Sequence, residues 1–299
     1  MSSRTDRLSF LGYRAGSAVA NALPVPAASL AARGLGRVFA RTMDGRREML
    51  RRHLRRVVGP STSDADLDRL VVAAFDSYAR YWLESFRLAS MTRDELEATM
   101  SWEGLSRLDE ALGRGKGVIL ALPHLGAWDF GGAWLAAVGH PLTVVVETLE
   151  PPELFAWFAE LRESFGLTVV AHGPAAGSVL LRALRGNGII ALLSDRDLAR
   201  TGIEVDFFGE RTTLPAGPAT LALRTGATIL PCTIYYEGAG HLGIVRPPVD
   251  TTRRGSLRED VARITQALAV ELEGMIRRAP EQWHLMQPNW PSDFDLVGG

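Results

Sequence analysis

The sequence predicts an α/β protein in which a mostly parallel central sheet is flanked by helices and preceded by a helical N-terminal layer. From about residue 100, short apolar runs rich in β-branched residues alternate with helical patterns, as in parallel sheets covered on both faces. The first hundred residues instead repeat apolar side chains at helical intervals. The chain has 299 residues and is 46% hydrophobic, so we expect one domain over 1–299 with a large core.

The N-terminal layer is predicted to be helical throughout. Helices are expected over 7–22, 46–58 and 63–90 because each segment carries apolar residues on one side. The third segment opens with "SDAD", in which Ser63 is a favourable N-cap and the aspartates suit the positive end of a helix.

The α/β core is expected over residues 100–299. Its predicted strands are 117–122, 142–147, 167–172, 188–194 and 227–236. The helices that separate or follow them are predicted over 126–138, 151–164, 177–185, 215–225 and 256–278. The segment "IEVDFFG" alternates polar and apolar residues, so we expect an additional, edge-like strand at 203–209.

Charge is distributed unevenly along the chain. Residues 1–60 contain 12 arginines and 3 acidic residues, a net charge of +9, against a formal net charge of −1 for the whole chain. Six of these arginines surround the apolar side of 46–58, which is typical of a helix on an anionic membrane surface. The alternative is a basic helix packed on the acidic remainder of the protein. Nucleic acid is not expected as a partner because aromatic residues are not interleaved with the arginines.

Composition also restricts the type of site. Cys232 is the single cysteine, which excludes a disulfide framework and a cysteine-based zinc site. The histidines other than His124 are scattered and form no i, i+4 pair, so no metal is expected. No stretch reaches the ~20 apolar residues that cross a bilayer, and we expect a soluble or peripheral protein.

One histidine and one aspartate mark a candidate catalytic site in "ALPHLGAWDF". His124 follows a predicted buried strand, and Asp129 falls in the first turn of the next helix. Ligands of open α/β sheets bind at the carboxyl ends of strands. A carboxylate that accepts from one ring nitrogen would make the other nitrogen a better general base. The alternative is an ordinary hydrogen-bonded histidine, because an H-x4-D spacing also occurs by chance.

Several blocks of sequence resemble one family in order along the chain. The motif "HLGAWD" is similar to the H-x4-D motif of glycerolipid and lipid A type acyltransferases. The blocks "YARYWLESFRL", "VVVETLEPPELFAWFAELRESFGL", "SDRDLARTGIEVDFFGERTTLPAGPATLA" and "PEQWHLMQPNW" resemble the phosphatidylinositol mannoside acyltransferases more specifically. The resemblance covers nearly the whole chain.

The resemblance implies that His124 deprotonates a sugar hydroxyl and that Asp129 orients His124. The hydroxyl would attack the thioester of an acyl-CoA, with palmitoyl-CoA as the expected donor and a phosphatidylinositol mannoside as the acceptor. Such direct transfer requires no covalent enzyme intermediate, no cofactor and no metal. The expected location is peripheral, at the cytoplasmic face of the cell membrane.

The resemblance also indicates further site residues. Substrate-binding roles are expected for Glu147, Arg162, Asp195, Arg196 and Arg211. Asp195 stands where close relatives carry a glutamate, so its reach is shorter by one methylene. Alternatively, Glu147 is an exposed acidic residue at the end of a strand, and Arg162 forms an ordinary ion pair on the protein surface.

Aromatic residues after the motif suggest a slot for a fatty chain. Trp128, Phe130 and Trp134 are the candidates, although aromatic residues at helical spacing also form ordinary core. Each CH₂ moved out of water contributes about 0.8 kcal/mol, so a slot of this kind would dominate donor binding. Two other functions remain possible from the sequence: a lipid A type or lysophospholipid acyltransferase, and a non-catalytic lipid-binding membrane-associated protein.

Overall fold

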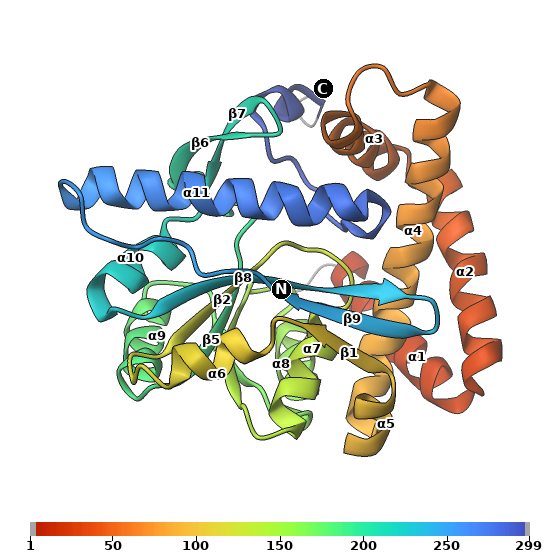
Figure 1. Ribbon diagram of the computed structural model, residues 1–299. Helices are drawn as coiled ribbons and strands as arrows, with labels where there is room; N and C mark the ends of the chain where they lie inside the picture. The colour runs from red at the N-terminus through yellow and green to blue at the C-terminus, as the bar shows by residue number, and fades with distance from the viewer. Residues whose placement is uncertain (1–3, 297–299) are drawn as a thin grey trace.

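The computed structural model describes residues 4–296 and confirms the α/β fold class (Figure 1). Its main sheet has seven strands in the order β1-β9-β8-β2-β5-β3-β4. All neighbouring pairs are parallel except β8 and β9. The strands are β1 (Met100–Glu103), β2 (Val118–Leu122), β3 (Leu142–Val146), β4 (Thr168–Ala171), β5 (Ile189–Leu193), β8 (Thr228–Glu237) and β9 (Gly240–Val245).

The two faces of the sheet bury separate apolar clusters, as expected for a parallel sheet with helices on both sides. Ile119 and Ala121 of β2 point into one cluster and Leu120 and Leu122 into the other. The first cluster includes residues of α9 (Ala176–Arg185), α10 (Gly217–Thr225) and α11 (Leu257–Arg278). The second is closed by α6 (Ser106–Leu112) and α7 (Trp128–Ala137). Figure 1 shows α11 lying along one side of the sheet and α6 and α7 on the other.

The helical N-terminal layer is also confirmed. It consists of α1 (Arg4–Ala22), α2 (Val25–Thr42), α3 (Asp44–Val58) and α4 (Asp64–Arg87), followed by the short α5 (Arg93–Ala98). Ser63 caps α4 by accepting a hydrogen bond from the backbone N–H of Asp66, as its sequence predicts. α2 runs beside α4 at the outer side of the molecule (Figure 1). α8 (Pro152–Ser164) packs with α1 and α4 through a small apolar cluster.

The strand expected at 203–209 exists but does not lie at the edge of the main sheet. β6 (Ile203–Phe207) pairs only with β7 (Glu210–Leu214), in an antiparallel two-stranded sheet. Figure 1 places this hairpin on the far side of α11 from the main sheet. Alternation predicts a strand with one buried face, but it does not say which other element covers that face.

The basic segment 46–58 forms α3, and its arginines are largely neutralised within the protein. Arg51 and Arg55 both contact Asp64, while Arg56 contacts Glu210 and Asp293. The apolar side of α3 is buried in the core. This helix therefore packs on the body of the protein, the alternative that the charge pattern left open, and most of its arginines form ion pairs with neighbouring acidic side chains. Within residues 4–296, no helix combines the length and the apolarity needed to span a bilayer.

Candidate active site

His124 lies in a tightly held loop between β2 and α7. The next glycine, Gly126, has a left-handed φ of 64°, and a Cβ there would collide with the carbonyl oxygen of Ile234. The backbone N–H of Gly126 donates to Gln282, and that of Ala127 donates to Ile234. The loop is therefore fixed by the C-terminal region and by β8, and glycine is required where the chain passes β8.

The structure pairs His124 with Asp195 and not with Asp129. The His124 Nδ1 atom lies 2.7 Å from Asp195 Oδ1, and the backbone N–H of His124 donates to Asp195 Oδ2 over 2.9 Å. Asp195 lies two residues beyond the end of β5, and β5 is the parallel neighbour of β2. The carboxyl ends of two adjacent strands thus supply the imidazole and its carboxylate. The expectation that Asp129 orients His124 is wrong for this structure.

The aspartate side chain is long enough for this contact, although close relatives were expected to carry a glutamate here. Asp195 is fully buried. Burial opposes its charged form, but His124 and the indole N–H of Trp283 outweigh burial and hold the pKa of Asp195 below its usual value. Asp195 is therefore ionised at neutral pH. With Nδ1 engaged by this carboxylate, Nε2 is the nitrogen of His124 that is left to accept a proton.

Asp129 belongs to a different buried ion pair. Arg162 from α8 donates from Nε to Asp129 Oδ1 over 3.0 Å and from Nη2 to Oδ2 over 2.8 Å, a two-pronged contact. The Tyr81 hydroxyl from α4 donates to Oδ2 over 2.7 Å. Although burial favours its neutral form, Asp129 raises the pKa of Arg162. This cluster joins α4, α7 and α8, so the motif aspartate ties the helical layer to the sheet beside His124.

Two cavities meet at His124, whose side chain is 26% exposed. The first, which we call the leucine-rich cavity, has a volume of about 400 Å³ and extends under the sheet between β2, α6 and α7. Leu108, Leu120 and Leu135 are typical of its inner wall. The second cavity, about 660 Å³, has a more polar lining that includes Glu147, Arg196 and the beginnings of α9 and α10. His124 is therefore within reach of an apolar and a polar ligand at once.

A second histidine borders the leucine-rich cavity. The backbone N–H of His284 donates to the carbonyl oxygen of His124 over 2.8 Å, and its Nε2 lies 2.9 Å from the Ser77 hydroxyl. Burial, helped by the proximity of His124, lowers the pKa of His284 to about 3. His284 is therefore uncharged at neutral pH and does not act as an acid there.

The remaining expected substrate-binding residues fall in different places. Glu147 follows β3 and contacts Arg196 over 3.4 Å, and both residues line both cavities. Arg162 lines the leucine-rich cavity while it holds Asp129. Arg211 lies on the β6–β7 hairpin, is 74% exposed, pairs with Glu204 and lines neither cavity, so the structure does not bring it together with the other expected residues.

The three aromatic residues expected to line a slot fall in different places. Trp128 lines the leucine-rich cavity and stacks on Tyr81 with ring centroids 4.0 Å apart. Phe130 is buried elsewhere and stacks on His241 at 3.7 Å. Trp134 packs against Trp102 at 5.0 Å, and neither Phe130 nor Trp134 is part of the cavity wall. The cavity wall consists mainly of aliphatic residues from strands and helices, which the sequence pattern presents as ordinary core, and of aromatic residues from α4 and α8 such as Trp82 and Phe158.

Sequence reasoning missed the residues that hold the two carboxylates. Tyr81 reaches Asp129 from α4, and Trp283 reaches Asp195 from the C-terminal region. Both lie in sequence blocks that resemble the acyltransferases, and this resemblance was the only indication in the sequence that they belong to the site. Within residues 4–296, no group of three or more histidine, cysteine or acidic side chains is arranged to hold a metal ion.

Comparison with known proteins identifies the family of the chain. Residues 4–292 match the family described as bacterial lipid A biosynthesis acyltransferase. The chain belongs to this family. The acyltransferase is 42% identical over 290 residues to the phosphatidylinositol mannoside acyltransferase of Mycolicibacterium smegmatis, covering 95% of this chain and 92% of the relative.

Two further relatives extend the comparison. A phosphatidylinositol mannoside acyltransferase of Mycobacterium tuberculosis is also 42% identical, over 94% of this acyltransferase and 88% of the relative. A lipid A biosynthesis acyltransferase of Haemophilus influenzae is 25% identical, over 75% of this chain and 69% of the relative. The family confirms that the protein is an acyltransferase.

Proposed function

We propose that this acyltransferase moves a long-chain acyl group, palmitoyl in the first instance, from acyl-CoA to a mannose hydroxyl of phosphatidylinositol mannosides. The observation that carries the proposal is the position of His124, which is held by a buried carboxylate where the leucine-rich cavity meets the second cavity. The two relatives at 42% identity bear the name of this activity.

In the proposed reaction His124 acts as the general base. Its Nε2 removes the proton from the sugar hydroxyl, and the oxygen attacks the thioester carbon. The tetrahedral intermediate then expels the CoA thiolate, which takes the proton back from His124. Asp195 stabilises the imidazolium that exists between the two proton transfers. Neither a covalent enzyme intermediate nor a cofactor is needed in this scheme.

The leucine-rich cavity is suited to the fatty chain of the donor. It begins beside His124 and penetrates the apolar cluster below the sheet. Because each buried CH₂ contributes about 0.8 kcal/mol, the chain supplies enough binding energy to hold the thioester beside Nε2. The polar groups of the second cavity, which include Glu147 and Arg196, then bind the hydroxyl-rich acceptor.

The substrate assignment is tested with purified protein and defined donors and acceptors. Palmitoyl-CoA together with a mannosylated phosphatidylinositol should release free CoA and yield an acylated glycolipid, detected by mass spectrometry. Lipid A precursors with acyl carrier protein and lysophospholipids with acyl-CoA serve as competing substrate pairs. Turnover with one of those pairs alone would overturn the substrate proposal. Ligand binding without turnover of any pair would favour a lipid-binding protein.

We further propose that the enzyme works as a peripheral protein on the cytoplasmic face of the membrane, where a two-chain acceptor resides. α1 and α2 expose large apolar side chains on the outer side of the molecule. They are Leu11, Val19, Leu30, Leu35, Val38 and Phe39. Leu30 is 73% exposed, and arginines of the same helices lie nearby in sequence. Apolar side chains mixed with cations are typical of helices that bind anionic lipid surfaces.

Flotation with lipid vesicles tests this membrane contact. We expect the protein to bind vesicles that contain anionic phospholipid, with weaker binding as salt rises because exposed charges are screened. Leu30→Gln/Leu35→Gln should reduce the bound fraction by at least about tenfold, since two apolar side chains lose their burial in lipid. Leu257→Gln, at an exposed leucine on α11, is the matched control and should float as the parent does. Equal flotation of the double variant would remove α2 from the membrane contact.

A further inference from the structure

The carboxylate that serves His124 is held by residues from the last turns of the chain. The indole N–H of Trp283 donates to Asp195 Oδ2 over 2.7 Å. The side-chain amide of Asn289 donates to the backbone carbonyl of Asp195 over 3.0 Å. Both side chains are buried. Asp195 is thus fixed at its carboxylate and at its backbone by one segment, residues 283–293, which we call the C-terminal clamp.

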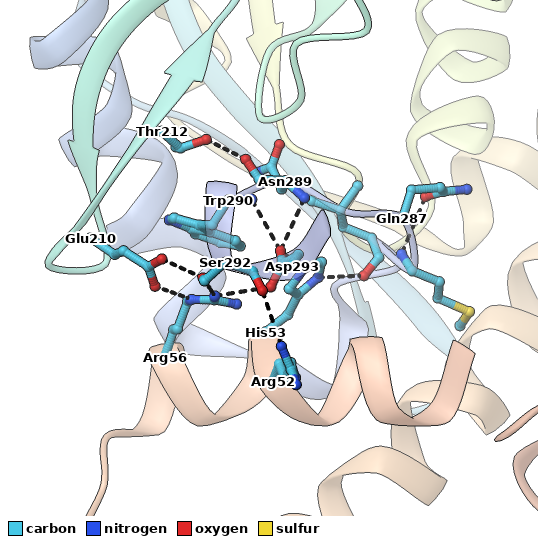
Figure 2. A network of polar contacts seen from close by, with 12 residues as sticks. Arg52, His53, Arg56, Glu210, Thr212, Gln287, Asn289, Trp290, Ser292 and Asp293 are labelled. Atoms are coloured by element: carbon cyan, nitrogen blue, oxygen red, sulfur yellow. Dashed lines mark hydrogen bonds and ion pairs between the residues drawn. The ribbon is translucent and has the colours of Figure 1, made fainter. Parts of the chain in front are cut away.

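The clamp is itself fastened to α3 by a buried polar network (Figure 2). His53 donates from Nδ1 to the carbonyl of Leu285 over 2.9 Å, and its Nε2 lies 3.0 Å from Asp293 Oδ2. Figure 2 shows the Asp293 carboxylate facing the backbone of the clamp, where it accepts the N–H groups of Asn289 and Trp290. His53 and Asp293 are both fully buried. Leaving either one unpaired is costly, so this network fixes the path of the clamp.

Aromatic packing sets the position of the Trp283 ring within this network. The ring centroid of Trp283 lies 5.6 Å from that of His53 and 5.8 Å from that of Phe208. A second buried tryptophan, Trp290, also belongs to the clamp, but its indole N–H donates to the carbonyl of Phe207 over 3.2 Å. The two tryptophans are both fully buried, and of their two N–H groups the one on Trp283 reaches Asp195.

We propose that two residues of the C-terminal clamp, Trp283 and Asn289, are positioning residues of the active site, and that the Trp283 N–H fixes the orientation of Asp195 and, through it, of His124. The inference rests on the proposed role of His124 as general base. Trp283 occupies one side of the Asp195 carboxylate, which leaves Oδ1 for the imidazole. Without this donor Oδ2 keeps only the backbone N–H of His124, so the carboxylate is held less firmly and the direction of Nε2 towards the substrate hydroxyl is less well fixed.

Trp283→Phe tests the proposal because it deletes the N–H and keeps most of the ring, with Trp290→Phe as the matched control. Misplacing a catalytic group by about 1 Å costs up to about 100-fold in rate. We therefore expect kcat to fall about 10- to 100-fold in Trp283→Phe, with little change in KM for acyl-CoA. Trp290→Phe loses a similar bond and similar volume, so it should lower thermal stability comparably and keep kcat near the parent value.

The pH profile and the NMR spectrum separate positioning from stability. Trp283 lowers the pKa of Asp195, so deleting its N–H raises that pKa and moves the acid limb of kcat/KM to higher pH. Of the groups near this carboxylate, His124 contacts it directly, Arg196 is engaged with Glu147, and His284 stays uncharged. The proton on His124 Nδ1, identified by its loss in His124→Ala, should shift in Trp283→Phe and remain in place in Trp290→Phe.

The NMR readout needs no substrate, so it tests the clamp even where the substrate assignment fails. If Trp283→Phe does not fold, Asn289→Ala replaces it, because that amide contacts the Asp195 backbone, and the same loss of kcat and the same NMR shift are expected. Equal kcat, pH profile and NMR shift in the Trp283 and Trp290 variants would refute a positioning role. A loss of kcat that is fully explained by a smaller fraction of folded protein would also refute the positioning role.

Discussion

His124→Ala should lower kcat by about 10²- to 10⁴-fold, the range that a positioned general base contributes. The imidazole stands at the junction of the two cavities, and Nε2 has no hydrogen-bond partner within residues 4–296. Removing it leaves the thioester and the sugar hydroxyl in place without a proton acceptor. The measurement is steady-state release of CoA from palmitoyl-CoA with a mannosylated phosphatidylinositol.

The control for this variant is His140→Ala. His140 is a partly exposed histidine that lies 3.7 Å from Asp109 and lines neither cavity. Its replacement should leave kcat unchanged. The thermal transition of His124→Ala should fall only moderately, because the buried Asp195 carboxylate keeps the N–H donors of Trp283 and of the residue 124 backbone. Turnover retained by folded His124→Ala would remove this residue from the mechanism.

Asp195→Asn should be comparably damaging, with kcat reduced by about 10³- to 10⁴-fold, as for the buried aspartate of a Ser-His-Asp triad. The amide keeps the shape of the side chain but cannot stabilise an imidazolium, and it can donate to Nδ1 and so favour the wrong tautomer. The Asp195 carboxylate also accepts two N–H groups besides the imidazole. Single-turnover rates across pH 5–9 measure the effect on the chemical step.

Asp129→Asn is the informative comparison, because the motif spacing favours Asp129 and the structure favours Asp195. Asp129→Asn removes the charge that pairs with the buried Arg162. Breaking a buried pair of this kind costs about 3–5 kcal/mol in the free energy of unfolding. We therefore expect a lower melting temperature and an acid limb of the rate profile like that of the parent. If Asp129→Asn instead reproduced the pH profile of Asp195→Asn, Asp129 would be the partner of the base.

The opposite roles of these two aspartates show what local sequence can and cannot determine. The H-x4-D spacing correctly places both residues beside the site, since His124 ends a strand and Asp129 begins the following helix. The partner of the imidazole depends on which strand beside β2 brings a carboxylate to the end of β2, which is flanked by β8 and β5. That strand is β5, and strand order is a property of the whole sheet. In the same way, the charge of α3 was evident in the sequence, whereas its pairing with Asp64, Glu210 and Asp293 was not.

The sequence by itself determined the alternation of strands and helices, the cap of α4, and the strand-end positions of His124, Glu147 and Asp195. These features depend on residues that are close together in the chain, through hydrophobic periodicity and local hydrogen bonds. Only the tertiary structure decided that Asp195 serves the base, that Asp129 binds Arg162, and that Trp283 returns from the C-terminal region to hold Asp195. Those contacts join residues 33–88 positions apart, and they form only when packing of the core brings distant strand ends and loops together.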